Sequence, residues 1–195
     1  MTGGGRPCDD RPVPAPPVLR PARPEDIGTI EELMRRSVLT HFPAFYDERQ
    51  TRSAARFTAR LDPMLVDDGT YLVHVAGDEI VSWGGWSRRA KLFAGPADAE
   101  GDDPARLIDP ATEPARIRAM FVREGWGRRG LARQLLDRSA ADAARAGFAS
   151  LVLVATLAGV PLYRACGFVD REPVPIVHPD GVELDGLVMG RAVSG

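Results

Sequence analysis

A glycine-rich turn between two apolar segments most constrains what this chain can fold into. Residues 115–122 (ARIRAMFV) have the apolar and β-branched content of a strand, and leucines at helical spacing follow over 130–146. A continuous apolar run, SLVLVA, then occupies 150–155, which is typical of a parallel strand covered on both faces. Strand, helix and strand in this order predict one right-handed βαβ unit.

The turn itself is predicted to bind an anion. It reads FVREGWGRRGLA over 121–132 and leads directly into the helix. Backbone N–H groups at a helix N-terminus point outward, and the helix dipole adds partial positive charge there. From Arg123 to Arg133 four arginines stand against one glutamate, a local charge of +3. A phosphate or pyrophosphate is therefore the expected ligand.

Secondary-structure signals outside this unit alternate helices and strands. Asp47 is the expected N-cap of a helix over 48–61, with Gln50 three residues later. Gly84-Gly85 inside a strand indicates a bulge or a close backbone approach. The other expected elements are a strand at 18–20, a helix from Pro24, a hairpin of 70–76 with 79–86, a short helix at 160–165, and strands from Phe168 with a turn at 178–181.

Composition bounds the class of protein. The 195 residues carry a net charge of −2, with 44% hydrophobic and 27% charged residues, as in a soluble globular domain. The near balance of charge gives no reason to expect nucleic-acid or membrane binding. Two cysteines suit neither a disulfide framework nor a zinc site, so we expect no metal and a cytoplasmic location. One lysine among 25 basic residues suggests a GC-rich bacterial genome.

The chain is expected to form one domain. Residues 1–17 are rich in Gly and Pro and are predicted to be a disordered tail, which leaves a single domain over 18–195. Residues 94–114 hold six acids and one base, which predicts a flexible acidic loop. A solvated loop without a role is the simpler interpretation, and a lid over a cationic substrate is the alternative.

Two classes of ligand compete for the glycine-rich turn. Gly125, Gly127 and Gly130 spell G-x-G-x-x-G, the dinucleotide-binding fingerprint. That fingerprint also requires an acid at the end of the next strand, where this chain reads Val154-Ala155-Thr156. The missing acid disfavours a nicotinamide-dependent oxidoreductase, and the competing ligand, coenzyme A, is implied by the family resemblance of two segments.

Two segments resemble the motifs of the GNAT superfamily of acyl-CoA-dependent N-acyltransferases. Residues 120–136 are similar to motif A, with Arg129-Gly130-Leu131-Ala132 opening the helix, and 159–168 are similar to motif B, with Tyr163 four residues before Gly167-Phe168. The resemblance covers about 18–192. It implies an α/β fold with a central mixed sheet that splays between two parallel strands and is flanked by helices.

The sequence departs from the family pattern at three places. Gly127 stands where motif A usually has Gln or Arg, and Ala132 replaces a second glycine. No Asn lies between Ala155 and Tyr163, where many members carry one.

The resemblance implies acetyl transfer from acetyl-CoA to a primary amine. In the family, the main chain of the first parallel strand binds pantetheine and the turn wraps the pyrophosphate. Carried over, the acetyl-CoA residues are Met120, Phe121, Val122, Gly127, Arg128, Arg129, Gly130, Leu131, Ala132 and Arg133. The Val122 N–H is the expected donor to the oxyanion, and Tyr163 is the expected proton donor to the departing thiolate.

The acceptor side of the site is less defined by sequence. The strand 115–122 has no carboxylate, so the general base is unassigned; Glu31, Glu32 and a water chain are candidates. Arg118, which alternates with Arg116, is a candidate for binding an acceptor carboxylate, and Trp86 is a candidate wall of the acceptor pocket.

Two functions from different classes therefore remain open. The first is an acetyltransferase acting on a small-molecule or peptide amine; a non-catalytic acyl-CoA-binding sensor is the alternative. Either is compatible with a homodimer.

Overall fold

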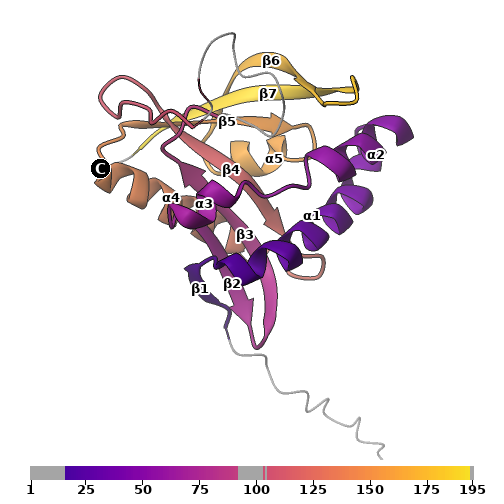
Figure 1. Cartoon of the computed structure of the whole chain (residues 1–195), viewed down its shortest axis with the longest axis horizontal. Helices are drawn as coiled ribbons and strands as arrows, with labels where there is room; N and C mark the ends of the chain where they lie inside the picture. Colours follow the sequence, from indigo (N-terminus) through magenta and orange to yellow (C-terminus); the bar gives the residue numbers. More distant parts are fainter. Residues whose placement is uncertain (1–15, 92–102, 104, 194–195) are drawn as a thin grey trace, which may run out of the picture.

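Seven strands of the described residues form one mixed sheet in the order β1-β2-β3-β4-β5-β7-β6 (Figure 1). The computed structural model describes residues 16–91, 103 and 105–193. Only β4 and β5 pair in parallel; the neighbouring pairs are antiparallel. The strands are β1 (Val18–Pro21), β2 (Tyr71–Ala76), β3 (Glu79–Ser87), β4 (Ala115–Val122), β5 (Ser150–Thr156), β6 (Val169–Val177) and β7 (Glu183–Ala192).

Helices cover both faces of this sheet. Helices α1 (Ile27–His41), α2 (Glu48–Phe57) and α3 (Pro63–Asp67) lie on one face, and α4 (Leu131–Arg145) and α5 (Val160–Ala165) lie on the other (Figure 1). Each face has its own apolar core. Tyr71 and Trp83 pack under α1 to α3, whereas Trp86 and Leu151 pack under α4 and α5. The two faces thus sandwich β4 and β5, the strands of the predicted βαβ unit.

The strands β4 and β5 separate soon after they begin. Their ladder consists of Ala115 with Leu151 and Arg116 with Val152, and the strands then diverge. The predicted splay between two parallel strands is thereby confirmed. Backbone groups further along the facing edges have no partner in the other strand, so they are available to a ligand.

A bulge in β4 adds to this separation. Between the pairs Trp83–Phe121 and Gly85–Arg118 the β4 strand has one extra residue, and Ala119 adopts a φ of +46°. A Cβ on Gly84 would lie 2.2 Å from the Met120 Sδ and 3.0 Å from the Met120 Cα, so a larger residue at 84 would force Met120 to shift. The irregularity expected at Gly84-Gly85 is therefore real, and its function is to accommodate the bulge.

The predicted helix over 48–61 is shorter than expected. Asp47 and Gln50 form the anticipated capping box, but α2 ends at Phe57. The residue before a proline avoids helical geometry, and Asp62 is extended with a ψ of 114°. Its side chain caps α3, which begins at Pro63. The sequence did not predict α3 as a separate helix.

The acidic segment 94–114 is partly outside the described residues. The described remainder contacts the domain, and the flexibility of the acidic segment stays a prediction. Ile108 is 4% exposed, Leu107 forms a bridge with Arg89, and the Arg106 guanidinium lies 2.9 Å from Glu113. The predicted tail, 1–17, lies almost wholly outside the described residues.

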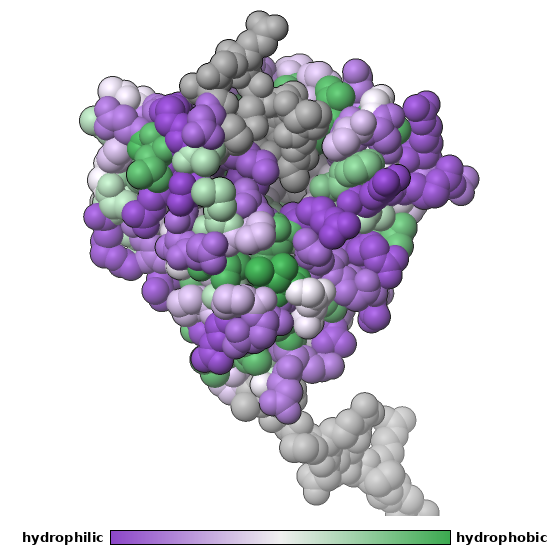
Figure 2. All heavy atoms as spheres, viewed as in Figure 1, coloured by the Kyte–Doolittle hydropathy of each residue, from purple (hydrophilic) through white to green (hydrophobic). Residues whose placement is uncertain are grey.

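Most of the surface in the view of Figure 2 is hydrophilic, including the outer sides of α1 and α2 at its right edge. Hydrophobic residues gather near the centre of this face, which lies over the sheet. None of the helices described has both the length and the apolar character that crossing a membrane requires.

Candidate active site

A cavity of about 120 Å³ lies where β4 and β5 diverge. Its walls come from the divergent strands, from α5 and from the segment between α2 and α3. From the strands and α5, the lining residues are Ile117, Arg118, Ala119, Met120, Phe121, Val154, Ala155, Thr156, Gly159 and Tyr163. The cavity is therefore the space that the splay creates.

The main chain of β4 alternates between its partner β3 and the cavity. The Arg123 N–H donates to the Val81 carbonyl at 2.9 Å, so Arg123 faces β3. Because successive residues of a strand point their backbone groups to opposite sides, the Val122 N–H faces the splay. The Phe121 main chain faces β3 instead. Phe121 contributes its side chain, which lines the cavity and stacks on Trp83.

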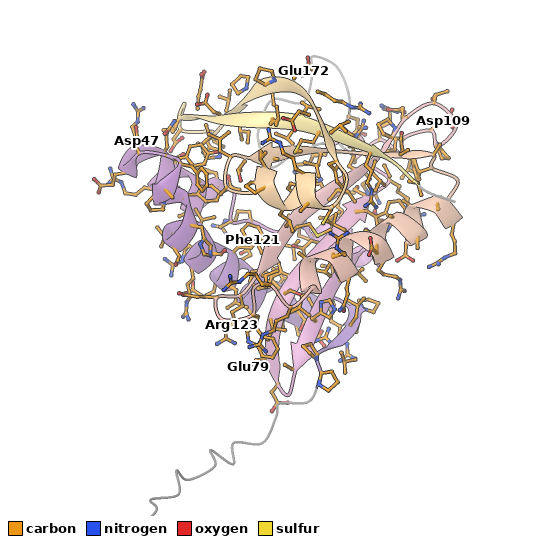
Figure 3. All side chains as sticks on the ribbon, turned by 180° about the vertical axis from the view of Figure 1, so that it is seen from behind. Asp47, Glu79, Asp109, Phe121, Arg123 and Glu172 are labelled. Carbon is orange, nitrogen blue, oxygen red and sulfur yellow. The ribbon has the colours of Figure 1, made fainter. Side chains whose placement is uncertain are left out.

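Beyond β4, the glycine-rich turn is preorganised by three left-handed residues. Gly125 and Gly130 have φ of +79°, and Arg128 has φ of +60°. The Arg129 guanidinium donates to the Gly125 carbonyl and lies 4.5 Å from the centroid of the Trp126 ring. Arg123 pairs with Glu79 at 3.0 Å, and Figure 3 shows these two side chains together below Phe121.

Helix α4 starts directly from this turn. Gly130 is its N-cap, and the Gln134 N–H donates to the Gly130 carbonyl at 3.0 Å. The N–H groups of Leu131, Ala132 and Arg133 precede that bond, so they have no partner within the helix. Arg128, Arg129 and Arg133 lie beside these donors in the sequence, so the terminus has the charge and the donor groups that an anion site requires.

A buried histidine fixes α4 against the sheet. His74 Nδ1 lies 2.7 Å from Ser82 Oγ, and its Nε2 lies 3.1 Å from Gln134 Oε1. The amide oxygen accepts from Nε2–H, which leaves Nδ1 to accept from the serine. Burial lowers the pKa of His74, so the ring is neutral at pH 7. Its role is structural, as expected for a lone histidine in a strand.

Tyr163 reaches the cavity from α5. The residue is 8% exposed and packs edge-to-face on Phe168. Burial raises the pKa of Tyr163 well above its usual value, and a hydrogen bond with the Met120 backbone opposes this only in part. The phenol therefore stays protonated at the bulge of β4, the position expected of a proton donor.

Arg118 also reaches the cavity, among other charged groups. It is 6% exposed and donates to the Lys91 carbonyl at 3.0 Å. Its guanidinium lies 4.0 Å from the Asp62 carboxylate, and Lys91 Nζ lies 3.5 Å from the same carboxylate. Arg116 does not line the cavity; it lies 3.7 Å from Glu113.

Three other sequence candidates do not reach the cavity. Trp86 is 2% exposed and packs edge-to-face on Phe148 beneath α4, so it is a core residue and not a pocket wall. Glu31 pairs with Arg60, and Glu32 pairs with Arg35 and Arg36 on the outer surface of α1. Neither glutamate is positioned as a general base.

The sequence did not reveal the part of the cavity that the segment between α2 and α3, α3 itself and β6 supply. The residues are Thr58, Arg60, Leu61, Asp62, Leu65 and Ile176. Asp62-Pro63 is a recognisable start of a helix. No local pattern, however, links it to β4 more than 50 residues later in the chain.

Comparison with known proteins decides the family. The model of the acetyltransferase (GNAT) family matches residues 31–168, which include β4, the turn, α4, β5 and α5. The chain belongs to the acetyltransferase (GNAT) family. The predicted family and fold are thus confirmed, the chain is an acyltransferase by family, and the dinucleotide interpretation of the glycines is set aside. No curated protein matches the chain by sequence.

Solved structures of GNAT proteins share the fold at low identity. A GCN5-related N-acetyltransferase from Rhodopseudomonas palustris is 18% identical, with a TM-score of 0.67, over 93% of this chain and 99% of its own. The PaiA N-acetyltransferase from Thermoplasma acidophilum, solved with coenzyme A, is 14% identical, with a TM-score of 0.62, over 91% and 99%. The putative acetyltransferase YncA from Salmonella typhimurium, solved with acetyl-CoA, is 18% identical, with a TM-score of 0.58, over 93% and 96%.

Proposed function

We propose that this GNAT protein transfers the acetyl group of acetyl-CoA directly to a primary amine. One observation carries the proposal: the diverging part of β4 and Tyr163 line one cavity, and the turn after β4 leads directly into the N-terminus of α4. The acceptor is a small-molecule or peptide amine, and residues 18–195 act as one domain. We retain the cytoplasm as its expected location.

Three features of the described residues fit acetyl-CoA. The Leu131, Ala132 and Arg133 N–H groups, with Arg128 and Arg129 beside them, match a pyrophosphate in charge and donor type. The edge of β4 at Met120 and Val122, which has no partner in β5, matches the amide groups of pantetheine. The cavity has room for an acetyl thioester at the end of that edge.

Acetyl-CoA supplies an acetyl group activated as a thioester. The Val122 N–H donates to the carbonyl oxygen as negative charge develops on it, and this donor is worth several kcal/mol in a site closed to water, about 2.7–4 kcal/mol in comparable cases. Tyr163 gives its proton to the departing sulfur. Burial keeps the phenol protonated until that moment, and the same burial disfavours a free thiolate.

Charge at the cavity favours an acceptor that carries an anionic group. Arg60 and Arg118 line the cavity with one carboxylate, Asp62, so cations outnumber anions among its lining residues. An acceptor with a carboxylate beside its amine would meet Arg118 deep in the cavity. A bidentate contact of this kind is a common use of arginine.

The decisive experiment is a thermal shift with acetyl-CoA, with NAD and NADP as controls. A ligand at 100 times its Kd adds about 2.7 kcal/mol to the free energy of unfolding. Free-thiol release on a panel of amines then measures transfer. A shift with acetyl-CoA and release with at least one amine are expected. Binding without release on any amine would instead favour a non-catalytic acyl-CoA sensor, and no shift would remove the proposal.

A further inference from the structure

A chain of hydrogen bonds runs from the cavity to a carboxylate on the turn between β6 and β7. Thr58, a lining residue of the cavity, places its Oγ1 2.9 Å from His178 Nε2. His178 Nδ1 lies 2.8 Å from Ser53 Oγ. The serine hydroxyl donates to Asp180, with 2.9 Å to each carboxylate oxygen. His178 and Ser53 are buried, at 1% and 4% exposure, while Asp180 is exposed.

Every donor in this series of hydrogen bonds can point away from the cavity. Because the Ser53 hydrogen is given to Asp180, the Ser53 oxygen is free to accept from His178 Nδ1–H. That tautomer leaves Nε2 as an acceptor for the Thr58 hydroxyl. The Thr58 oxygen in turn accepts a proton from the cavity side. Such an alignment conducts a proton outward from the cavity.

The described residues that line the cavity offer no other free base for the acceptor amine. The strand β4 has no acidic residue, and Asp62, the single carboxylate among the lining residues, is held by Lys91 and Arg118. A primary amine with a pKa of about 10.4 is an ammonium at pH 7 and has no lone pair for attack. Its proton must leave before the carbon–nitrogen bond forms.

We propose that Thr58, His178, Ser53 and Asp180 form a relay that takes the proton from the acceptor amine. The proposal rests on the acetyltransferase function above. The ammonium N–H proton passes to Thr58 Oγ1 as the Thr58 proton passes to His178 Nε2. The resulting imidazolium is held by Ser53 and Asp180 while the neutral amine attacks the thioester. One proton per turnover then leaves through Ser53 and Asp180 to water.

The surroundings of the relay suit this direction of transfer. Desolvation would raise the pKa of Asp180, but hydrogen bonds from Ser53 Oγ and from the Val182 N–H lower it overall, so this carboxylate is ionised at pH 7. Burial lowers the pKa of His178, and the charge of Asp180 opposes this. The ring therefore rests neutral at pH 7 with its acceptor atom toward Thr58. The charged residues that line the cavity with Thr58 are Arg60, Asp62 and Arg118.

A substitution of one hydroxyl tests the relay. Thr58→Val keeps the shape of the side chain but removes the link to His178. Thr51→Val is the matched control in α2, the helix that ends just before Thr58, because Thr51 is buried and its Oγ1 has no hydrogen-bond partner among the described residues. Asp180→Asn keeps an acceptor for Ser53 but removes the proton-accepting carboxylate. Each variant is first shown to bind acetyl-CoA by the thermal shift of the wild type.

Two acceptors of similar shape separate proton removal from binding. The alkyl amine 4-(aminomethyl)benzoate is protonated at pH 7, whereas the aryl amine 4-aminobenzoate is neutral. We expect Thr58→Val and Asp180→Asn to lower kcat/KM for the alkyl amine by about 10²-fold. Activity on the aryl amine stays within about 3-fold, and Thr51→Val changes neither.

The pH profile adds a second readout. With the relay, the proton is stored in the protein during transfer, so kcat/KM for the alkyl amine is nearly flat between about pH 7 and pH 9. In Thr58→Val, kcat/KM for the alkyl amine should rise about tenfold per pH unit, because it follows the neutral fraction of an amine with a pKa of about 10.

Equal losses on both amines, or no loss on either, would overturn the relay. Acetyl-CoA binding by the wild type without turnover of either amine would also overturn it. Failure of the wild type to bind acetyl-CoA at all would instead contradict the transferase function itself.

Discussion

The hydroxyl of Tyr71 donates a hydrogen bond of 2.9 Å to the carbonyl oxygen of Ala119. Tyr71 is fully buried in β2, and burial raises the pKa of its phenol well above the usual value, so it remains a donor at any pH of interest. Ala119 is the residue of β4 with a φ of +46°. This single bond therefore holds the bulge that directs β4 away from β5 and opens the cavity.

Removing this hydroxyl should affect both stability and cofactor binding. We expect Tyr71→Phe to lower the free energy of unfolding by about 1–3 kcal/mol, since a buried carbonyl loses its partner. It should also raise the KM for acetyl-CoA several-fold as the bulge relaxes. Tyr46→Phe is the control. The Tyr46 hydroxyl donates to the Asp185 carbonyl and accepts from the Leu157 N–H, away from the bulge. A KM effect of equal size in both variants would refute the assignment to the bulge.

The carboxylate of Glu113 should make stability depend on acid pH. Two bonds from Arg106 and one from the Asp109 N–H lower the pKa of Glu113 to about 2. Because the folded pKa lies below the unfolded value of about 4.3, its stabilisation is complete above that value and is lost as pH falls toward 2. We expect Glu113→Gln to lower Tm at pH 7 by about 2–4 °C, equivalent to roughly 1 kcal/mol.

This difference between Glu113→Gln and the wild type should shrink steadily below about pH 4. Glu25→Gln serves as a control, because Glu25 is exposed and pairs only distantly with Arg23, at 3.9 Å. A Tm difference that is the same at pH 7 and pH 3 would show that the charge of Glu113 contributes nothing.

Sequence predicted those parts of this GNAT protein that depend on local pattern. The βαβ unit was predictable because each of its three elements has a local pattern. The strands are apolar runs at 115–122 and 150–155, and the leucines of α4 recur at helical spacing. Trp86 was misjudged because alternation shows which residues share a face but not which helix covers it. Thr58, Asp62 and His178 escaped notice because their roles arise from contacts between segments far apart in sequence.

The departure at Gly127 offers a gain-of-function test. A Cβ at Gly127 would meet no atom within 4 Å, so a side chain fits there without displacement. The resemblance to motif A implies a Gln or Arg at this position. We expect Gly127→Arg to lower the Kd for acetyl-CoA by about 3–10-fold, as one more cation meets the pyrophosphate. Gly127→Ala is the control and should leave the Kd unchanged, as measured by calorimetry at fixed salt.

Tyr163 should be important for turnover but not for cofactor binding. Tyr163→Phe keeps the ring that packs on Phe168 and removes only the proton donor. We expect kcat to fall by about 10²–10⁴-fold. The thermal shift with acetyl-CoA should persist, since the turn and the β4 edge are intact. Unchanged kcat in Tyr163→Phe would remove this residue from the mechanism.

Arg118 should discriminate between acceptors, not between acyl donors. Arg118→Gln removes a cation from the cavity wall but retains a donor toward the Lys91 carbonyl. We expect kcat/KM to fall by about 10–10²-fold for an amine that carries a carboxylate, an effect of about 1.4–2.8 kcal/mol. The matched amine with a methyl ester should be affected by less than about 3-fold. Equal losses on the two acceptors would mean that Arg118 supports the cavity through Asp62 and does not bind substrate.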